Sequence, residues 1–548
     1  MDSPEPVADA ESRVDLAPAA WFLHADERGN PSTTIDAAHA DGVAWTVGSR
    51  AQVLTDGAAY FARLYEELCT TRTGDTVLFT DWEGDADERL AGDESDVGAV
   101  LRDVATRGVD VRGLLWRSHP KAMNFSAEAN LDLARTVNEA GGEVLLDHRV
   151  RRGGSHHQKL VVVRRARPDD DVAFVGGIDL CHGRHDDRRH LGDPQAADLD
   201  PDHYGARPPW HDVQIELHGP AIADVEWTFR ERWEDPTPLD TRNPWRALLH
   251  RRAQRPAEPS ALPDPVTRTA DGPLAVQVLR TYPVRRRAYP FAPAGERSIG
   301  RAYVKAFGRA RRLIYLEDQY LWSFHAARCL TEALNREPDL LVVIVIPRYP
   351  DPDGLVAGGA SRIGREYVLD QLIAAGGDRV AVYDLENDEG TSIYVHSKAV
   401  VVDDLWLTVG SDNLNRRSWT HDSEVSCAVI DSTRDERSPV DPTGRDEGAR
   451  RIARDTRLSL SGEHLGRAPG DDADLVEPDS WFAAMRSSAK ALDAWHADGQ
   501  RGERPTGHLR EHPVERVRGV RRIGHQVVHR LLLDPDGRPR ALRRADKL

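Results

Sequence analysis

The sequence is poor in cysteine and in long apolar runs. Its four cysteines, Cys69, Cys181, Cys329 and Cys427, stand far apart and form no CxxC pair, so we expect buried free thiols in a reducing compartment and no disulfide framework. No apolar run approaches the roughly 20 residues that a membrane-spanning helix needs. The opening segment MDSPEPVADAES is acidic and has no apolar centre, so we expect no secretory signal. The expected location is the cytoplasm or the periphery of a membrane, with export by a dedicated system as the alternative.

Net positive charge is also missing. The formal net charge is −17 over 548 residues, whereas nucleic-acid-binding proteins need a basic face. The charge therefore excludes nucleic acid as the expected partner and disfavours strongly anionic membranes. The C-terminal segment 508–548 is the exception, because it is basic. This tail is predicted either to touch lipid headgroups or to be solvated or packed on an acidic lobe.

Lysine is the scarcest charged residue, with six lysines among the 73 basic residues. Two of them, Lys159 and Lys398, stand two positions after a histidine, in SHHQKLVVV and VHSKAVVVD. Random placement would give about 0.24 His-x-Lys pairs in a chain of this composition. The pairs lie one in each half of the chain, which is typical of a duplicated unit.

The spacing of each pair has a geometric consequence. Side chains at positions i and i+2 of a β-strand point to the same face. His157 therefore shares a face with Lys159, and His396 shares one with Lys398. Each pair opens an apolar strand that is followed by a second strand ending in small residues, AFVGGID and WLTVGSDN. The glycines at these corners, Gly176, Gly177 and Gly410, leave room for a ligand to approach the backbone.

The remainder of the chain alternates β- and α-type patterns. Strands are expected at 76–83, 109–116, 142–150, 311–321 and 340–347, and helices at 61–69, 97–108, 328–336 and 365–377. Such alternation predicts the α/β class, with two pseudo-symmetric lobes that each contain a mixed, mostly parallel sheet flanked by helices. The expected divisions are a flexible N-terminus (1–19), a first lobe (20–254), a Pro-rich linker (255–273), a second lobe (274–470) and a C-terminal extension (471–548).

A local grouping of Cys181, His182, His185 and His190 could be interpreted as a metal site. Its spacing fits no standard zinc pattern. We therefore expect no metal and no cofactor.

The second block carries a complete known motif. It reads HxKxxxxD, then six residues, then GSxN, with the residues His396, Lys398, Asp403, Gly410, Ser411 and Asn413. The chain thus resembles the phospholipase D superfamily, over about residues 20–470. Its first block, HHQKLVVV…FVGGIDLCHGRHD, is similar to the first motif of eukaryotic-type phospholipases D and their bacterial relatives. The segments WHDVQIELHGP and IYLEDQYLW resemble the same branch.

The first block departs from the motif in two places. Arg164 stands where the motif has aspartate, and Asp179 stands where the family often has asparagine. We interpret Arg164 as a loop residue. Neither change is expected to abolish activity, because the His-Lys pair is retained.

The resemblance implies an active site at the lobe interface. His157 would be the nucleophile and His396 the general acid/base, although the symmetry of the sequence alone does not choose between them. Lys159, Lys398, Asn413 and Ser411 are the candidate phosphate ligands, and Asp403 supports the motif. Each imidazole needs a carboxylate on its other nitrogen. We predict Asp212, in WHD, for His157 and Glu424, in DSE, for His396.

The implied function is hydrolysis of the distal phosphodiester of glycerophospholipids such as phosphatidylcholine, by a monomer at a membrane or micelle surface, with possible transfer to another alcohol. No calcium-binding lipid domain is visible, so no obligatory calcium is expected. One alternative is a phospholipid synthase of the cardiolipin type. The other is a non-catalytic lipid-binding scaffold with one degraded motif.

Overall fold

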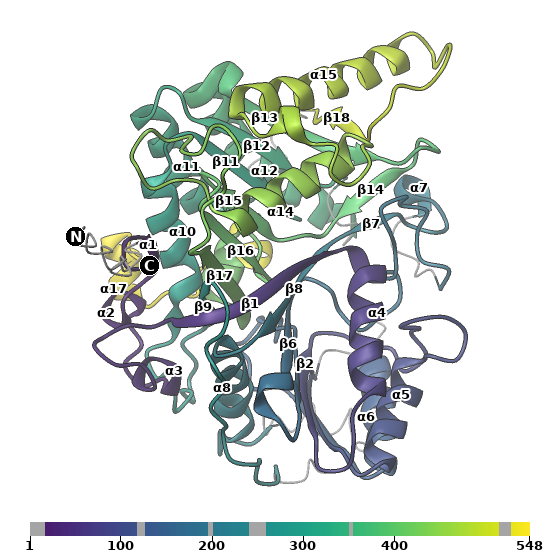
Figure 1. Ribbon diagram of the computed structural model, residues 1–548, viewed down its shortest axis with the longest axis vertical. Coiled ribbons are helices and arrows are strands. Elements are labelled where there is room, and N and C mark those ends of the chain that lie inside the picture. The colour runs from purple at the N-terminus through teal and green to yellow at the C-terminus, as the bar shows by residue number, and fades with distance from the viewer. Residues whose placement is uncertain (1–16, 118–126, 196–200, 240–258, 350–353, 514–527) are drawn as a thin grey trace, which may run out of the picture.

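The computed structural model describes residues 17–117, 127–195, 201–239, 259–349, 354–513 and 528–548. Within these residues the two halves of the chain each build a β-sheet. In Figure 1 the first half lies below and the second half above, with helices on the outside of both.

The first sheet has the strand order β4–β3–β2–β5–β6–β8–β1. Strands β2, β3 and β4 are parallel, and every other neighbouring pair is antiparallel. The bounds are β1 Thr46–Thr55, β2 Thr76–Asp81, β3 Asp110–Trp116, β4 Glu143–Asp147, β5 Leu160–Arg164, β6 Val172–Gly176 and β8 Val213–His218.

The second sheet repeats this order as β13–β12–β11–β15–β16–β17–β9, with β18 added antiparallel to β13. The bounds are β9 Leu274–Tyr282, β11 Leu313–Glu317, β12 Leu341–Val345, β13 Val380–Glu386, β15 Ala399–Val402, β16 Trp406–Gly410, β17 Glu424–Asp431 and β18 Leu509–Glu511. Strand β1 pairs with β8 and also with β9, so one strand belongs to both sheets. The duplicated unit seen in the sequence is therefore a duplicated sheet.

The mixed α/β class is confirmed, but the parallel part of each sheet is smaller than the sequence suggested. Among the described residues, only three strands in each half run parallel to one another. The reason lies in the His-x-Lys strands, β5 and β15. Each is joined to the next strand by a short loop, and short loops can connect only antiparallel neighbours.

Helices cover both faces of each sheet. One face of the first sheet is covered by α4 (Asp56–Cys69), α5 (Val97–Thr106) and α6 (Ala127–Glu139), and the other by α8 (Ala221–Trp233). In the second half, α10 (Ser298–Arg309), α11 (Phe324–Arg336) and α12 (Gly354–Gly376) face α14 (Arg451–His464) and α15 (Pro478–Ala497) across the sheet. Helix α4 shows the cause: Tyr60, Phe61, Leu64 and Leu68 recur at helical spacing and are all buried.

Short elements complete the fold. They are α1 (Ala17–Trp21), α2 (Ala25–Arg28), α3 (Thr34–Ala37), α7 (Pro201–Tyr204), α13 (Arg416–Thr420), α17 (Arg540–Ala545), β7 (Trp210–His211), β10 (Glu296–Arg297) and β14 (Ser392–Val395). Single turns occur at Pro168–Asp170, Gly377–Arg379, Ala473–Leu475 and His529–Leu533.

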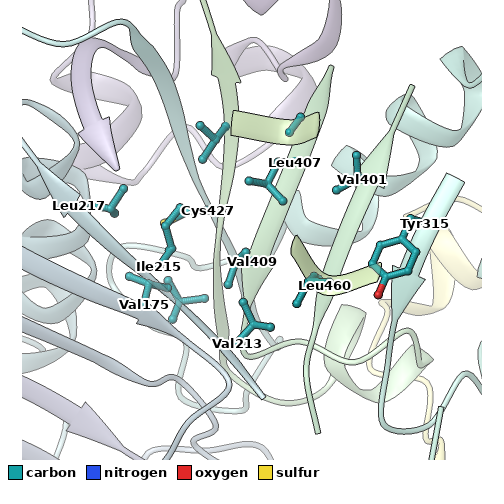
Figure 2. Close-up of a cluster of buried hydrophobic side chains, with 14 of the residues drawn as sticks. Val175, Val213, Ile215, Leu217, Tyr315, Val401, Leu407, Val409, Cys427 and Leu460 are labelled. Atoms are coloured by element: carbon teal, nitrogen blue, oxygen red, sulfur yellow. The ribbon is translucent and has the colours of Figure 1, made fainter. Parts of the chain in front are cut away.

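One hydrophobic core joins the two sheets. Figure 2 shows Val175, Val213 and Ile215 of the first sheet beside Leu407, Val409 and Cys427 of the second. All of these side chains are fully buried. Because apolar surface from both halves is removed from water in one cluster, the two sheets hold each other in place.

The four cysteines are free, and Cys181 and Cys427 are buried as expected. The expectation was wrong for Cys69, which is exposed, and Cys329 is half-buried. Cys69 ends α4 and lies off the apolar face that includes the buried Leu68.

The expected domain boundaries stay predictions. Residues 1–16 of the predicted N-terminus and 255–258 of the predicted linker lie outside the described residues. Residues 259–273 contain no helix or strand. Trp21, Phe22 and Trp45, which fall within the expected first lobe, pack in the core of the second half. Strand β18 of the expected C-terminal extension belongs to the second sheet.

Candidate active site

The two His-x-Lys pairs stand at equivalent places in the two sheets. His157 lies three residues before β5, and His396 lies three residues before β15. Both lysines turn back toward their own histidine: Lys159 Nζ donates to the His157 carbonyl oxygen at 3.2 Å, and Lys398 Nζ donates to the carbonyl oxygen of His396. His157 keeps more exposure than His396, with 17% of its side chain accessible against 6%.

Each half supplies the carboxylate that orients the histidine of the other half. His157 Nδ1 lies 2.8 Å from Glu424 Oε2, and His396 Nδ1 lies 2.6 Å from Asp212 Oδ2. This corrects the sequence-based pairing, which assigned Asp212 to His157 and Glu424 to His396. That pairing assumed that each half is self-contained. The carboxylates reach across instead, because β8 and β17 line the interface between the sheets.

Backbone hydrogen bonds join the halves beside both histidines. The His157 N–H donates to the Ser423 carbonyl at 2.9 Å, and the His396 N–H donates to the His211 carbonyl at 2.8 Å. The short parallel pair of β7 and β14 also crosses between the halves. Both imidazoles are thus fixed at the same interface between the halves.

The electrostatics of the site favour neutral imidazoles. Burial, followed by repulsion from the adjacent lysines, lowers the pKa of both His157 and His396 well below the usual range. A neutral imidazole is the nucleophilic form. Burial, opposed by Asp212 and reinforced by Lys159, lowers the pKa of Lys398 to about 8. The positive charge of Lys159 therefore lowers the pKa of Lys398 as well as the pKa values of both histidines.

The glycines at the strand corners leave space for this machinery. A Cβ atom at Gly177 would lie 2.2 Å from Asp212 Oδ1, the carboxyl group that holds His396. A Cβ atom at Gly410 would lie 1.9 Å from Ser426 Oγ, and one at Gly176 would meet Gln214 at 2.2 Å. The requirement at these corners is close packing, since none of the three glycines has a positive φ.

Ser411 and Asn413 have different surroundings. The Ser411 hydroxyl donates to Glu424 Oε2 at 2.6 Å and accepts from the Val425 N–H at 3.1 Å. It therefore positions Glu424. The Asn413 side chain is buried, and its Oδ1 has no hydrogen-bond partner among the described residues. The proposed contact of Ser411 and Asn413 with phosphate stays a prediction.

Asp403 supports the motif from the far end of β15. Its carboxylate accepts the backbone N–H groups of Arg311, Arg312 and Leu313 at 2.7–2.9 Å, which fixes the start of β11. The first half reverses this arrangement. Asp75, before β2, accepts the Ala166 N–H at 3.1 Å. Arg164 is the last residue of β5 and is buried, so its interpretation as a loop residue was wrong. Its guanidinium binds Glu226 at 3.2 Å and the Asp264 carbonyl at 2.8 Å instead.

Two charged residues at the site, Asp179 and Arg184, were not predicted from the sequence to bind substrate or to support the motif. Asp179 pairs with Lys159 at 3.2 Å, and Lys159 and other neighbours hold its pKa at about 2 against the effect of burial. Arg184 lies 3.9 Å from Asp179, and its guanidinium stacks 3.9 Å from the centre of the Trp210 ring. The signal was available, because both residues follow the Gly176-Gly177 corner within eight positions.

Aromatic rings flank both histidines. Trp82 contacts the His157 ring edge-on at 6.3 Å and stacks on Trp116 at 5.7 Å. Trp210 lies 4.9 Å from the His396 ring and stacks on Tyr394 at 4.7 Å. The site is therefore a charged centre between two apolar aromatic pairs.

A second buried group of ionisable side chains adjoins His396 through strand β7. His211 Nδ1 lies 3.0 Å from Asp56 Oδ1, and its Nε2 lies 2.9 Å from Glu317 Oε2. Ligand-type atoms converge within 4.8 Å of one another in two sets: Asp56, His190, His211 and Glu463, and His211, Glu317 and His464. Histidine and carboxylate sets of this kind could hold a divalent metal ion. The expectation of no metal stays a prediction.

The local grouping of Cys181, His182, His185 and His190 is not one of these sets. Its members separate in the fold: His182 lies 3.2 Å from Asp87, the His185 ring packs on Phe61 and only His190 reaches the buried group.

A match to a known protein family shows to which family the chain belongs. The family described as Phospholipase D matches residues 77–329 and 378–531. The chain belongs to the phospholipase D family. Phospholipase D beta 2 of Arabidopsis thaliana is 26% identical over 591 residues, covering 82% of this chain and 61% of the relative. Phospholipase D alpha 1 of Ricinus communis is 25% identical over 537 residues, covering 77% of this chain and 65% of the relative. The chain thus spans less than two thirds of these two family members.

Among solved structures, a phosphatidylserine synthase from Haemophilus influenzae aligns with a TM-score of 0.47 and 17% identity, covering 70% of this chain and 82% of that one. No helix within the described ranges has the length and apolarity needed to cross a membrane.

Proposed function

We propose that the protein is a phosphodiesterase that cleaves the distal ester of glycerophospholipids and releases phosphatidate and the headgroup alcohol. The observation that carries the proposal is the exchange of carboxylates between the halves. His157 and His396 each present Nε2 while the other nitrogen is held by a buried carboxylate, at 2.8 and 2.6 Å. This arrangement supports two histidines acting on one phosphorus atom.

The chemistry begins with nucleophilic attack. His157 Nε2 attacks phosphorus and forms a P–N bond while the P–O bond to the headgroup breaks. When the anionic phosphodiester is bound, its charge and that of Asp212 stabilise His396 as the imidazolium, which donates its Nε2–H proton to the departing alkoxide. Lys159 and Lys398 neutralise the charge on the phosphoryl oxygens.

The second step reverses the roles of acid and base. Water loses a proton to His396 and attacks phosphorus, and the P–N bond breaks to regenerate His157. Another alcohol can replace water in this step, which would give transfer of the phosphatidyl group. The substrate class is supported by the family's lipid-cleaving relatives and by the aromatic pairs beside both histidines.

The test is an assay with phosphatidylcholine. The native chain is expected to release choline and phosphatidate. The His157→Ala and His396→Ala chains should lose this activity while keeping the native circular dichroism spectrum. Intact lipid with the native chain, across a panel of headgroups, would support a scaffold and refute the proposal.

A further inference from the structure

A basic cavity lies outside the catalytic groups. It has a volume of about 840 Å³, and nine of its fifteen lining residues are arginine while none is acidic. The chain as a whole has a net charge of −17. The positive charge of the cavity is therefore a local feature, opposite in sign to the net charge of the chain.

Three segments that carry all the arginines form most of the cavity, residues 148–152, 284–287 and 538–543, and Thr237 and Pro238 complete its wall. Each segment is connected to the catalytic interface. Residues 148–152 follow β4 and lead directly to His157. Residues 284–287 follow β9, whose Thr281 pairs with Glu424. The third segment is bound to α13, because the Gly537 N–H donates to Thr420 Oγ1 at 2.9 Å.

Four of the arginines are held in place by protein groups. Arg149 pairs with Asp147 at 3.0 Å, Arg285 with Asp235 at 3.4 Å and Arg538 with Asp536 at 2.9 Å. Arg151 bridges the other two segments by donating to the carbonyls of Val284 at 3.1 Å and Gly537 at 2.8 Å. These residues build the walls of the cavity.

The other five arginines are exposed and have no such partner. No carboxylate within the described part of the chain pairs with Arg152, Arg286, Arg287, Arg540 or Arg543. Burial and repulsion from Arg543 lower the pKa of Arg151, which shows that positive charges are crowded here. A guanidinium group can donate two parallel hydrogen bonds to the oxygens of one phosphate group. A cluster of arginines without carboxylate partners therefore favours a phosphate-bearing ligand.

We propose that this cavity docks the protein on a membrane by binding the phosphate headgroups of anionic phospholipids. The inference rests on the proposed function, since a lipid surface is then the substrate phase. The chain or a hydrogen bond links each of these segments to the elements that carry His157 and Glu424, so docking through them would bring the catalytic interface toward the bilayer. The cavity also explains how a strongly acidic protein can approach an anionic surface.

The test measures binding separately from turnover. Co-sedimentation is carried out with the His157→Ala chain, which cannot consume the lipid, on phosphatidylcholine vesicles with and without phosphatidylglycerol. We expect partitioning to increase with phosphatidylglycerol and to fall with added salt. The triple substitution R286Q/R287Q/R543Q should weaken partitioning about 100-fold, since each arginine near an anionic surface contributes appreciably.

A matched control removes the same charge elsewhere. R102Q/R445Q/R501Q changes three exposed arginines outside the cavity and should bind like the parent chain. In the otherwise native chain, both triple variants should hydrolyse a monomeric short-chain phosphatidylcholine at the native rate. Equal loss of vesicle binding in both variants, or none in either, would overturn the proposal.

Free phosphate is the other source of the same chemistry. If inorganic tripolyphosphate binds the cavity in calorimetry and the chain ignores phosphatidylglycerol vesicles, the lipid assignment is wrong. Vesicle binding without hydrolysis of any lipid would leave the docking proposal intact and refute the proposed function alone.

Discussion

At the residue scale, the exchanged carboxylates make the roles of the two histidines separable. In a histidine-based site, replacing the orienting carboxyl group by an amide costs roughly 10³- to 10⁴-fold in kcat. Glu424→Gln and Asp212→Asn are both expected to lose about 10³-fold on phosphatidylcholine. The first should impair attack by His157 and the second should impair proton donation by His396.

A substrate with a good leaving group distinguishes the two variants. A p-nitrophenyl phosphodiester needs no proton donor in the first step. The Asp212→Asn chain should therefore keep its burst of p-nitrophenol, while the Glu424→Gln chain should lose it. The reverse pattern would exchange the roles of His157 and His396.

The pKa of Lys398 predicts an alkaline limit for activity. Its ammonium group is charged below about pH 8 and loses the proton as the pH rises through that value. The profile of kcat/KM, which reports the free enzyme, should therefore fall above about pH 8. Lys398→Arg should move this limb to higher pH, because guanidinium stays protonated. An unchanged limb in the arginine variant would exclude Lys398 as its source.

At the element scale, the corner after β6 must stay free of side chains. Gly177→Ala places a methyl group 2.2 Å from the Asp212 carboxylate, so this carboxylate must move away from His396. We expect kcat to fall at least about 100-fold, because displacing a catalytic group by roughly 1 Å has an effect of this size. The control is Gly462→Ala in α14, where, among the described residues, nothing beyond the adjacent helix backbone and chain neighbours lies within 4 Å of the new Cβ. Activity of the Gly177→Ala chain equal to that of the control would contradict the account.

Many of the helices and the parallel strands could be predicted from the sequence, because their apolar residues recur with helical or strand periodicity. The antiparallel majority was missed because β8, β9 and β17 are continuous buried runs. In a continuous apolar run, periodicity does not show whether the strand pairs parallel or antiparallel with its neighbours. The carboxylates themselves were found, but their partners were not, because partners depend on how two distant segments meet.

At the scale of the whole molecule, the two sheets are one structural unit. Strand β1 belongs to both, and a single core contains side chains from each. Arg164 illustrates why contacts between distant segments could not be predicted from the sequence alone. It fills a motif position, yet it binds Glu226 and the connecting segment at Asp264, and Asp75 anchors the hairpin. Position in a motif did not determine the contact.

The most direct test is the stoichiometry of the covalent intermediate. Rapid quenching with isotopically labelled phosphatidylcholine, followed by mass spectrometry of intact chain and peptides, counts the phosphatidyl groups and locates them. A single site shared by both halves predicts at most one group per chain, on His157, and none in the His157→Ala chain. Groups on both His157 and His396 of one chain would mean two independent sites and would contradict the account.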